Sequence, residues 1–254
     1  MPKIAALLTL GFKKAYERAV EWLRRARYRS ILIDLPEDFE PFLRTYMEGE
    51  CGLEEVWRHY RYLTGLSQPF VDSLRYQMDP LFKYLSREAP PEETYCYHDL
   101  SFHVESFRLA EEILLLEYRQ RVASGVKAED WRRILLKEAE RSKEALERVR
   151  ENIREKVKDE GLNVMLYGGY LSTLRETLKK EGYSVRVVCL RDYWKSPLDV
   201  LRTMVAHREV SDEELLKCVE EQMKYIDLII SHENVDEAHE KWSLMTGLKR
   251  GLSR

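Results

Sequence analysis

Apolar and polar residues follow a strand-helix-strand pattern in the second half of the chain. Residues 163–167 form an apolar run that stops at Gly168 and Gly169, a helical pattern ended by a glycine follows, and residues 184–190 are rich in β-branched side chains. This succession is typical of a β-α-β unit with parallel strands. Because ligands of such sheets bind beyond the carboxyl ends of the strands, Gly168, Gly169 and Tyr170 are candidate ligand-binding residues.

The same pattern occurs at the start of the chain. Residues 3–10 are apolar and end at Gly11, residues 12–26 have the period of a helix, and residues 29–35 form a second apolar run. These residues predict a second β-α-β unit. Asp34 places a charge near the end of this otherwise apolar run, so it either caps the helix that follows or faces a ligand.

A helical insertion, or cap, is predicted for residues 36–90. Prolines and glycines divide it into short helices, with residues 69–78 and 80–86 expected as two pieces separated at Pro80. Residues 57–65, WRHYRYLTG, interleave aromatic side chains with arginine. Such a helix either stacks on nucleic-acid bases or buries its aromatic side chains and leaves its arginines in solvent.

A third strand and a helix follow the insertion. Residues 93–97 alternate as a strand does and end at His98 and Asp99, and residues 101–124 predict a helix with His103 in its first turn. We expect His103 to be exposed or to cap this helix. His98 and Asp99 would point to opposite faces if the strand continued through them.

The longest periodic segment is 130–158, whose apolar positions repeat in a heptad-like stripe. The stripe predicts either a helix packed on neighbouring elements or a homodimer contact. Helices are also predicted from Pro197 onward, and residues 226–230, which have the composition of either a helix or an edge strand, are assigned to a helix.

Composition restricts the class of protein. The 254 residues suit one large domain, and a net charge of −3 with 34% charged residues gives no overall basic field for nucleic acid. Four scattered cysteines lack the spacing of zinc ligands, so no metal is predicted and a cytoplasmic location is expected. No run is long enough to span a membrane. Abundant Arg and Glu with few Gly resemble thermophilic compositions.

The ends of the predicted strands supply the best argument for a site. The five strands end at Gly11, Asp34, His98-Asp99, Gly168-Gly169 and Arg191-Asp192. If the sheet is parallel, these groups converge on one edge, where they suit a polar or anionic ligand.

The order of elements resembles the TraB/PrgY, ChaN and erythromycin-esterase-like superfamily over roughly residues 3–190. The resemblance is carried by LTLG ending at Gly11, IDLPEDFEPFL (33–43), CYHD (96–99), ERSKEAL (140–146) and NVMLYGGYLSTLRETLKKEGYSV (163–185). It implies an α/β fold with a site at the strand ends, in which Asp34 and Arg141 are pocket groups.

The sequence departs from this superfamily at its chemical positions. Members thought to be active place a histidine three residues after a glycine at two sites and end the second strand in glutamate. Here the residue three positions after Gly11 is Lys14, the residue three positions after Gly168 is Leu171, and the second strand ends in Asp34 in place of glutamate. Histidine-dependent or metal-dependent hydrolysis of the family kind is therefore not expected.

The sequence thus predicts a single α/β domain with a mostly parallel sheet of about five strands, a helical cap at about 36–90, long helices at about 101–158 and a helical C-terminal region. We expect a diverged hydrolase-like protein that binds a polar small molecule or anion. The sequence does not decide between an active and an inactive enzyme, and it identifies no cofactor. The alternative is a protein that binds RNA or a ribonucleoprotein through Arg58 and Arg61. The candidate catalytic residues are Asp34, His98, Asp99 and Arg141, and the candidate ligand-binding residues are Gly11, Gly168, Gly169 and Tyr170.

Overall fold

The computed structural model describes residues 1–9, 11–122, 127–168, 172–190 and 195–246. Within these ranges five parallel strands form one sheet in the order β3-β2-β4-β1-β5. The strands are β1 (Lys3–Leu8), β2 (Ser30–Pro36), β3 (Thr94–His98), β4 (Leu162–Tyr167) and β5 (Ser184–Cys189). The predicted α/β class and all five predicted strands are confirmed.

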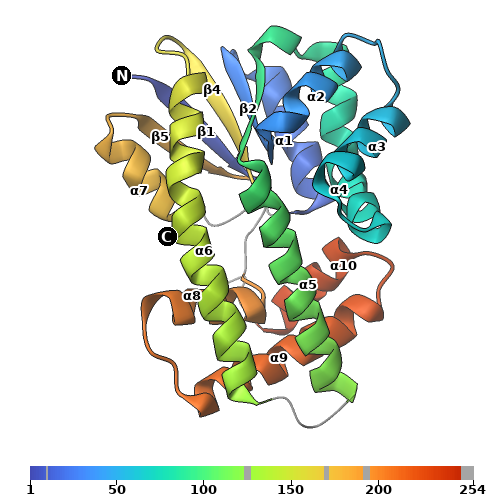
Figure 1. Ribbon diagram of the computed structural model, residues 1–254, viewed down its shortest axis with the longest axis vertical. Coiled ribbons are helices and arrows are strands. Elements are labelled where there is room, and N and C mark those ends of the chain that lie inside the picture. Colours follow the sequence, from blue (N-terminus) through green and yellow to red (C-terminus); the bar gives the residue numbers. More distant parts are fainter. Residues whose placement is uncertain (10, 123–126, 169–171, 191–194, 247–254) are drawn as a thin grey trace. The chain divides into compact units, whose positions relative to one another are not determined.

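Figure 1 shows the helices of the described part of the chain together with this sheet. They are α1 (Lys13–Arg25), α2 (Glu40–Met47), α3 (Leu53–Thr64), α4 (Gln68–Glu88), α5 (Leu100–Val122), α6 (Ala128–Lys156), α7 (Ser172–Lys180), α8 (Pro197–His207), α9 (Asp212–Ile230) and α10 (Val235–Met245), with 3-10 turns η1 (Glu37–Phe39) and η2 (Pro91–Glu93). None of the helices in the described part of the chain has the length and apolar character needed to cross a membrane.

The chain divides into two compact units. Unit 1 comprises Met1–Val104 and Ala145–Arg191 and contains the sheet, whereas unit 2 comprises Glu105–Glu144 and Asp192–Arg254 and is helical. The division falls within α5 and α6. The expectation that the whole chain is one domain stays a prediction.

The two faces of the sheet in unit 1 are covered by different helices. One face packs against α7 and the end of α6 in a cluster that includes Ile4, Ala6, Met165, Leu174 and Ile153. Figure 1 shows α1 to α4 on the other side of the sheet. Since α1 follows β1 and α7 follows β4, the chain leaves these two neighbouring strands toward opposite faces. This is the topological switch point at which open α/β sheets bind ligands.

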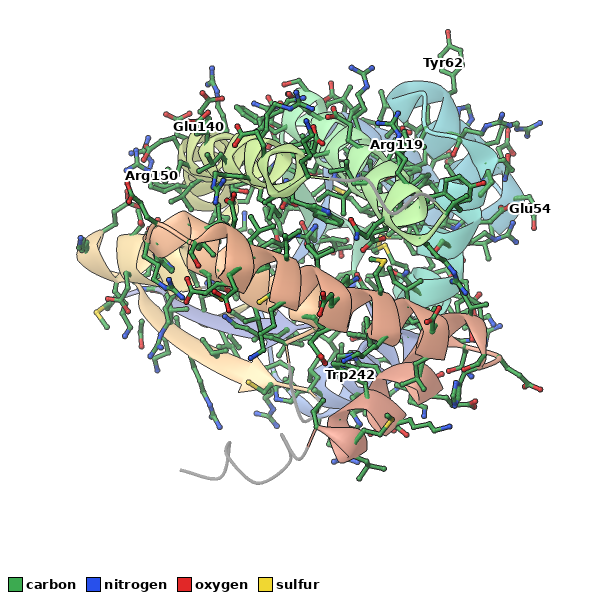
Figure 2. All side chains as sticks on the ribbon, turned by 90° about the horizontal axis from the view of Figure 1, so that it is seen from below. Glu54, Tyr62, Arg119, Glu140, Arg150 and Trp242 are labelled. Atoms are coloured by element: carbon green, nitrogen blue, oxygen red, sulfur yellow. The ribbon has the colours of Figure 1, made fainter. Side chains whose placement is uncertain are left out.

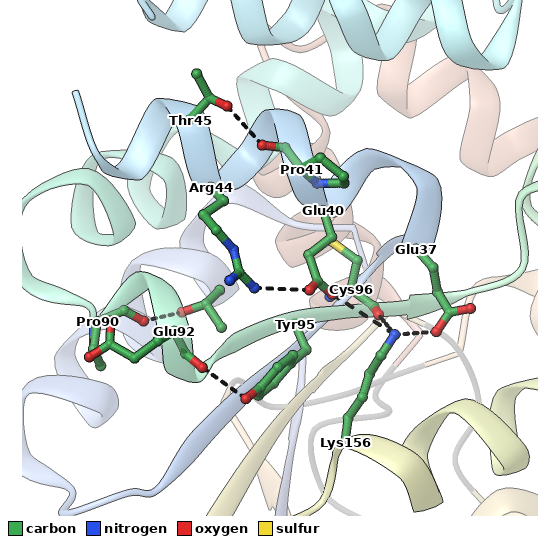
Figure 3. Close-up of polar contacts among 11 residues, drawn as sticks. Glu37, Glu40, Pro41, Arg44, Thr45, Pro90, Glu92, Tyr95, Cys96 and Lys156 are labelled. Carbon is green, nitrogen blue, oxygen red and sulfur yellow. Dashed lines mark hydrogen bonds and ion pairs between the residues drawn. The ribbon is translucent and has the colours of Figure 1, made fainter. Parts of the chain in front are cut away.

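Charged side chains from η1, α2 and α6 close the outer edge of β3 (Figure 3). The amide of Cys96 donates to Glu40 Oε2 at 3.0 Å, and Lys156 Nζ donates to the Cys96 carbonyl at 2.7 Å. Lys156 also forms an ion pair with Glu37. Cys96 is fully buried, and β3 is an edge strand of the described sheet. The amide and the carbonyl of Cys96 therefore bind side chains at the edge where a further strand would otherwise pair.

The helical insertion differs from its prediction at one proline. Residues 68–88 form the single helix α4, with Pro80 inside it, instead of two pieces. Proline removes only one backbone donor, and Met78, Leu81 and Phe82 are buried on either side of it, so packing holds the helix together. In α3, Trp57 and Tyr60 are buried, as the ordinary alternative for this segment predicts.

Unit 2 has its own hydrophobic core. Trp131 is fully buried there, among side chains from α5, α6, α8 and α9 that include Leu109, Ile113, Leu135, Leu201, Leu215 and Val219. The apolar stripe of α6 is used within the chain, because Leu135 packs in this core whereas Val149 and Ile153 pack on the sheet of unit 1. These buried positions are not available to a second copy. Residues 226–230 are helical, within α9, as predicted.

Candidate functional site

An irregularity in β2 brings two candidate residues together. In the pairing of β2 with β3, Ile33 lies opposite Cys96 and Pro36 lies opposite His98, so β2 has one more residue than β3 between these pairs. A bulge of this kind redirects side chains and is frequent beside functional sites. Here the extra residue lies beside Asp34, and Asp34 Oδ1 forms an ion pair with His98 Nε2.

The other carboxylate oxygen of Asp34 is held by the turn after β4. The Gly168 amide donates to Asp34 Oδ2 at 2.7 Å. A Cβ atom at position 168 would lie 2.8 Å from the same oxygen, which explains why a glycine fits here. Asp34 therefore connects the ends of three neighbouring strands, β3, β2 and β4.

Electrostatics keep the Asp34 carboxylate charged. Burial raises its pKa, but His98 and the Gly168 hydrogen bond outweigh this effect, so the pKa lies below its ordinary value. Both side chains retain some exposure, 19% for Asp34 and 21% for His98. Neither side chain is therefore completely enclosed.

Four tyrosines surround this carboxylate: Tyr16, Tyr60, Tyr97 and Tyr167. Burial, with the nearby Asp34 charge as a further cause, raises the pKa of all four phenols, so they stay protonated. The Tyr97 hydroxyl donates to the Leu166 carbonyl at 2.8 Å. The phenols around the Asp34 carboxylate are therefore neutral hydroxyl groups, and the carboxylate itself is charged.

A second histidine contributes to the site. His103 is only 8% exposed, its Nε2 lies 2.7 Å from the Tyr60 hydroxyl, and its ring centroid is 5.8 Å from that of His98. Burial lowers the pKa of His103 to about 3, with the neighbouring His98 as a further cause, so this ring is neutral. The sequence-based expectation of an exposed or capping His103 is wrong, because the side chain points into unit 1.

Asp99 and Gly11 have roles in turns. β3 has ended at Asp99, whose Oδ1 accepts from Ser101 Oγ at 2.6 Å and from the Phe102 amide at 3.1 Å, as at a helix N-terminus. Gly11 has a φ of +71°, a conformation that glycine adopts without strain, after β1. The contacts of Asp99 are those of a cap, and the structure shows no hydrogen bond between Asp99 and Asp34.

The remaining candidates are not placed at this site. Arg141 belongs to unit 2, where its Nε lies 2.7 Å from Glu105 Oε2. Gly169, Tyr170 and the Arg191-Asp192 pair lie outside the residues that the structure describes. Their proposed contacts with a ligand stay predictions.

Neither metal-binding geometry nor similarity to known proteins identifies this site. In the described ranges no three or more His, Cys, Asp or Glu side chains gather in a way that could hold a metal ion. Searches against family models, characterised proteins and solved structures find no match to the chain. The resemblance to the TraB/PrgY, ChaN and erythromycin-esterase-like superfamily stays a prediction from short motifs.

Proposed function

We propose that unit 1 binds a polar small molecule over the carboxyl ends of β2, β3 and β4, with Asp34 and His98 as its principal contacts. The observation that carries this proposal is the partly exposed Asp34–His98 pair, fixed by a bulge in β2 and by the Gly168 amide. It lies beside the switch point between β1 and β4. A pair that offers both a carboxylate and an imidazole suits ligands with hydroxyl, amine or anionic groups.

Energetics favour a functional role over a structural one. A largely buried ion pair stabilises a fold weakly, because the desolvation of both charges offsets their attraction. In addition, His98 Nδ1 is buried and has no hydrogen-bond partner in the described part of the chain. An unsatisfied buried ring nitrogen costs about 1–3 kcal/mol, and a purely structural pair would not require that cost.

The proposal is one of binding, with acid–base chemistry as a secondary role. Enzymes often orient a histidine as a general base by binding one of its ring nitrogens to a carboxylate, which leaves the other nitrogen to take up a proton. In His98, however, the second ring nitrogen is enclosed. The histidines that the superfamily resemblance would require after Gly11 and Gly168 are also absent from the sequence.

A thermal-shift screen tests the proposal. Inorganic phosphate, sugar phosphates, nucleotides, amino acids and dicarboxylates would each be added to wild type, Asp34→Asn and Asp38→Asn. Asp38 is an exposed aspartate close by in the sequence, so the same chemical change there serves as the matched control. We expect at least one compound to raise the Tm of wild type and of Asp38→Asn but not of Asp34→Asn. A compound that stabilises all three proteins equally, or no stabilising compound, would contradict the proposal.

A second candidate function is binding to single-stranded RNA through α3. Tyr62 is 90% exposed and extends away from α3 (Figure 2), and the side chain of the nearby Arg58 is 74% exposed. An exposed aromatic ring beside arginine suits base stacking with phosphate contacts. Acidic Glu55, 3.8 Å from Arg58, weakens this candidate.

The RNA candidate has its own test. Fluorescence anisotropy with oligo(U) should show binding that weakens steeply as salt is raised, and Arg58→Ala and Tyr62→Ala should reduce it. Asp34→Asn should leave it unchanged. Equal binding by all these proteins, or none by wild type, removes the candidate.

A further inference from the structure

One face of α5 carries apolar side chains that remain exposed in the described part of the chain. Leu114, Leu115, Tyr118 and Val122 are exposed by 52%, 55%, 65% and 65%. The opposite side of the same helix is buried in the core of unit 2. Contiguous apolar surface of this kind is uncommon on monomeric proteins and marks interaction sites.

Charges flank this apolar ridge in an ordered way. Glu111 lies four residues before Leu115 and Arg119 lies four residues after it, so all three share one side of the helix. Neither Glu111 nor Arg119 forms an ion pair with another described residue. The ridge therefore carries an unpaired acid toward its amino end and an unpaired base toward its carboxyl end.

We propose that the α5 ridge, Glu111 to Val122, is the contact of a homodimer in which two copies of α5 cross antiparallel. With the twofold axis at Leu115, each Glu111 faces Arg119 of the second copy, and the contact is made twice. A parallel pairing would instead place each charge opposite a like charge. The arrangement is isologous, as twofold interfaces require.

The expected affinity follows from the size of the ridge. One helix from each copy buries an area at the lower end of specific protein interfaces, so the dissociation constant should be on the order of micromolar. Leu115 meets its own counterpart at the axis, and Leu114, Tyr118 and Val122 enlarge the apolar centre. The two ion pairs fix the orientation.

Sedimentation velocity of the full chain from about 1 to 200 µM tests the dimer. Wild type should sediment as a monomer at the lowest concentration and mainly as a dimer at the highest. Leu115→Glu places two carboxylates together at the axis and should remain a single chain throughout. Leu244→Glu is the matched control, because Leu244 is a leucine on α10 with 63% exposure. That variant should dimerise as wild type does, and unchanged circular dichroism should show that both variants fold.

A charge exchange tests the antiparallel geometry. Glu111→Arg and Arg119→Glu each place like charges opposite one another and should weaken dimerisation at least tenfold. The double variant restores opposite charges and should recover the wild-type dissociation constant. A wild-type protein that stays a single chain overturns the proposal. So does a double variant no better than the single ones, or a Leu244→Glu variant that fails to dimerise.

Discussion

Asp34 and His98 lie on neighbouring strands and are joined in an ion pair because β2 has one more residue than β3 between their last two pairings. The same carboxylate accepts the Gly168 amide from a third strand end. The pair thus depends on three segments that are far apart in the sequence. Its contribution to stability should depend on pH.

For Asp34→Asn we expect a lower free energy of unfolding at neutral pH, by about 2–4 kcal/mol, because His98 loses its partner. The pKa of Asp34 is lower in the folded chain than in the unfolded chain. Its stabilisation is therefore fully present above about pH 4 and is lost as the pH falls through the folded value. Urea unfolding of both proteins between pH 3 and pH 7 measures this. A difference that stays constant as the pH falls would contradict the account.

Gly168→Ala should destabilise unit 1 by about 1–3 kcal/mol, because its Cβ would lie 2.8 Å from Asp34 Oδ2 and would displace the carboxylate. Gly52→Ala is the control, since an added Cβ there meets no atom within 4 Å. That change should cost less than about 1 kcal/mol. Thermal unfolding compares the two variants, and equal losses would show that the Gly168 turn tolerates a side chain.

His103→Gln should reduce the loss of stability of the protein in mild acid. In the folded chain the pKa of His103 is about 3, below that of an unfolded histidine. Wild type therefore loses stability as the pH falls below about 6.5, by about 2 kcal/mol at pH 5, whereas glutamine does not titrate. His207→Gln, at an exposed position of α8, is the control and should follow wild type. Chemical unfolding at pH 7, 6 and 5 gives the slopes, and parallel slopes for all three proteins would show that His103 titrates normally.

Lys156→Met should lower the free energy of unfolding by about 2–4 kcal/mol, because Glu37 and the Cys96 carbonyl lose a common charged partner. Lys179→Met removes an exposed lysine whose nearest acidic contact, Glu176, is 3.8 Å away. That control should change stability by less than about 0.5 kcal/mol. Urea titrations of the two variants compare their free energies of unfolding. A loss for Lys156→Met as small as that of the control would show that its contacts contribute no more than an exposed ion pair does.

Local patterns in the sequence account for most of the fold. Each strand was predicted within two residues at either end, since a buried parallel strand is a short apolar run that glycine or polar residues close. The prediction failed at Pro80, where packing in α4 overrides a local signal for a break. The division of α5 and α6 between two units was also not apparent, because their periodicity continues through the boundary.

The candidate site was predicted only in part. Asp34 and His98 could be named because each ends an apolar strand, and adjacent parallel strands bring such ends together. The bulge that lets them pair has no distinct pattern in the sequence. The Tyr60–His103 contact joins residues 43 positions apart on two different helices, so no local period could show it. Asp99 was grouped with His98 by proximity, but the next helix uses it as a cap.

The partners of Cys96 have a consequence for how the protein behaves in a crowded solution. An unpaired strand edge can add an extended segment of another chain, and repeated addition leads to aggregates. Glu40 and Lys156 occupy the amide and the carbonyl that such a segment would need at the centre of β3. Replacing Lys156 by methionine would remove the donor to that carbonyl and leave it without this partner. That variant would offer an unpaired carbonyl to an incoming strand while Glu40 still holds the amide, so the two side chains together limit the sheet to its present width at this point.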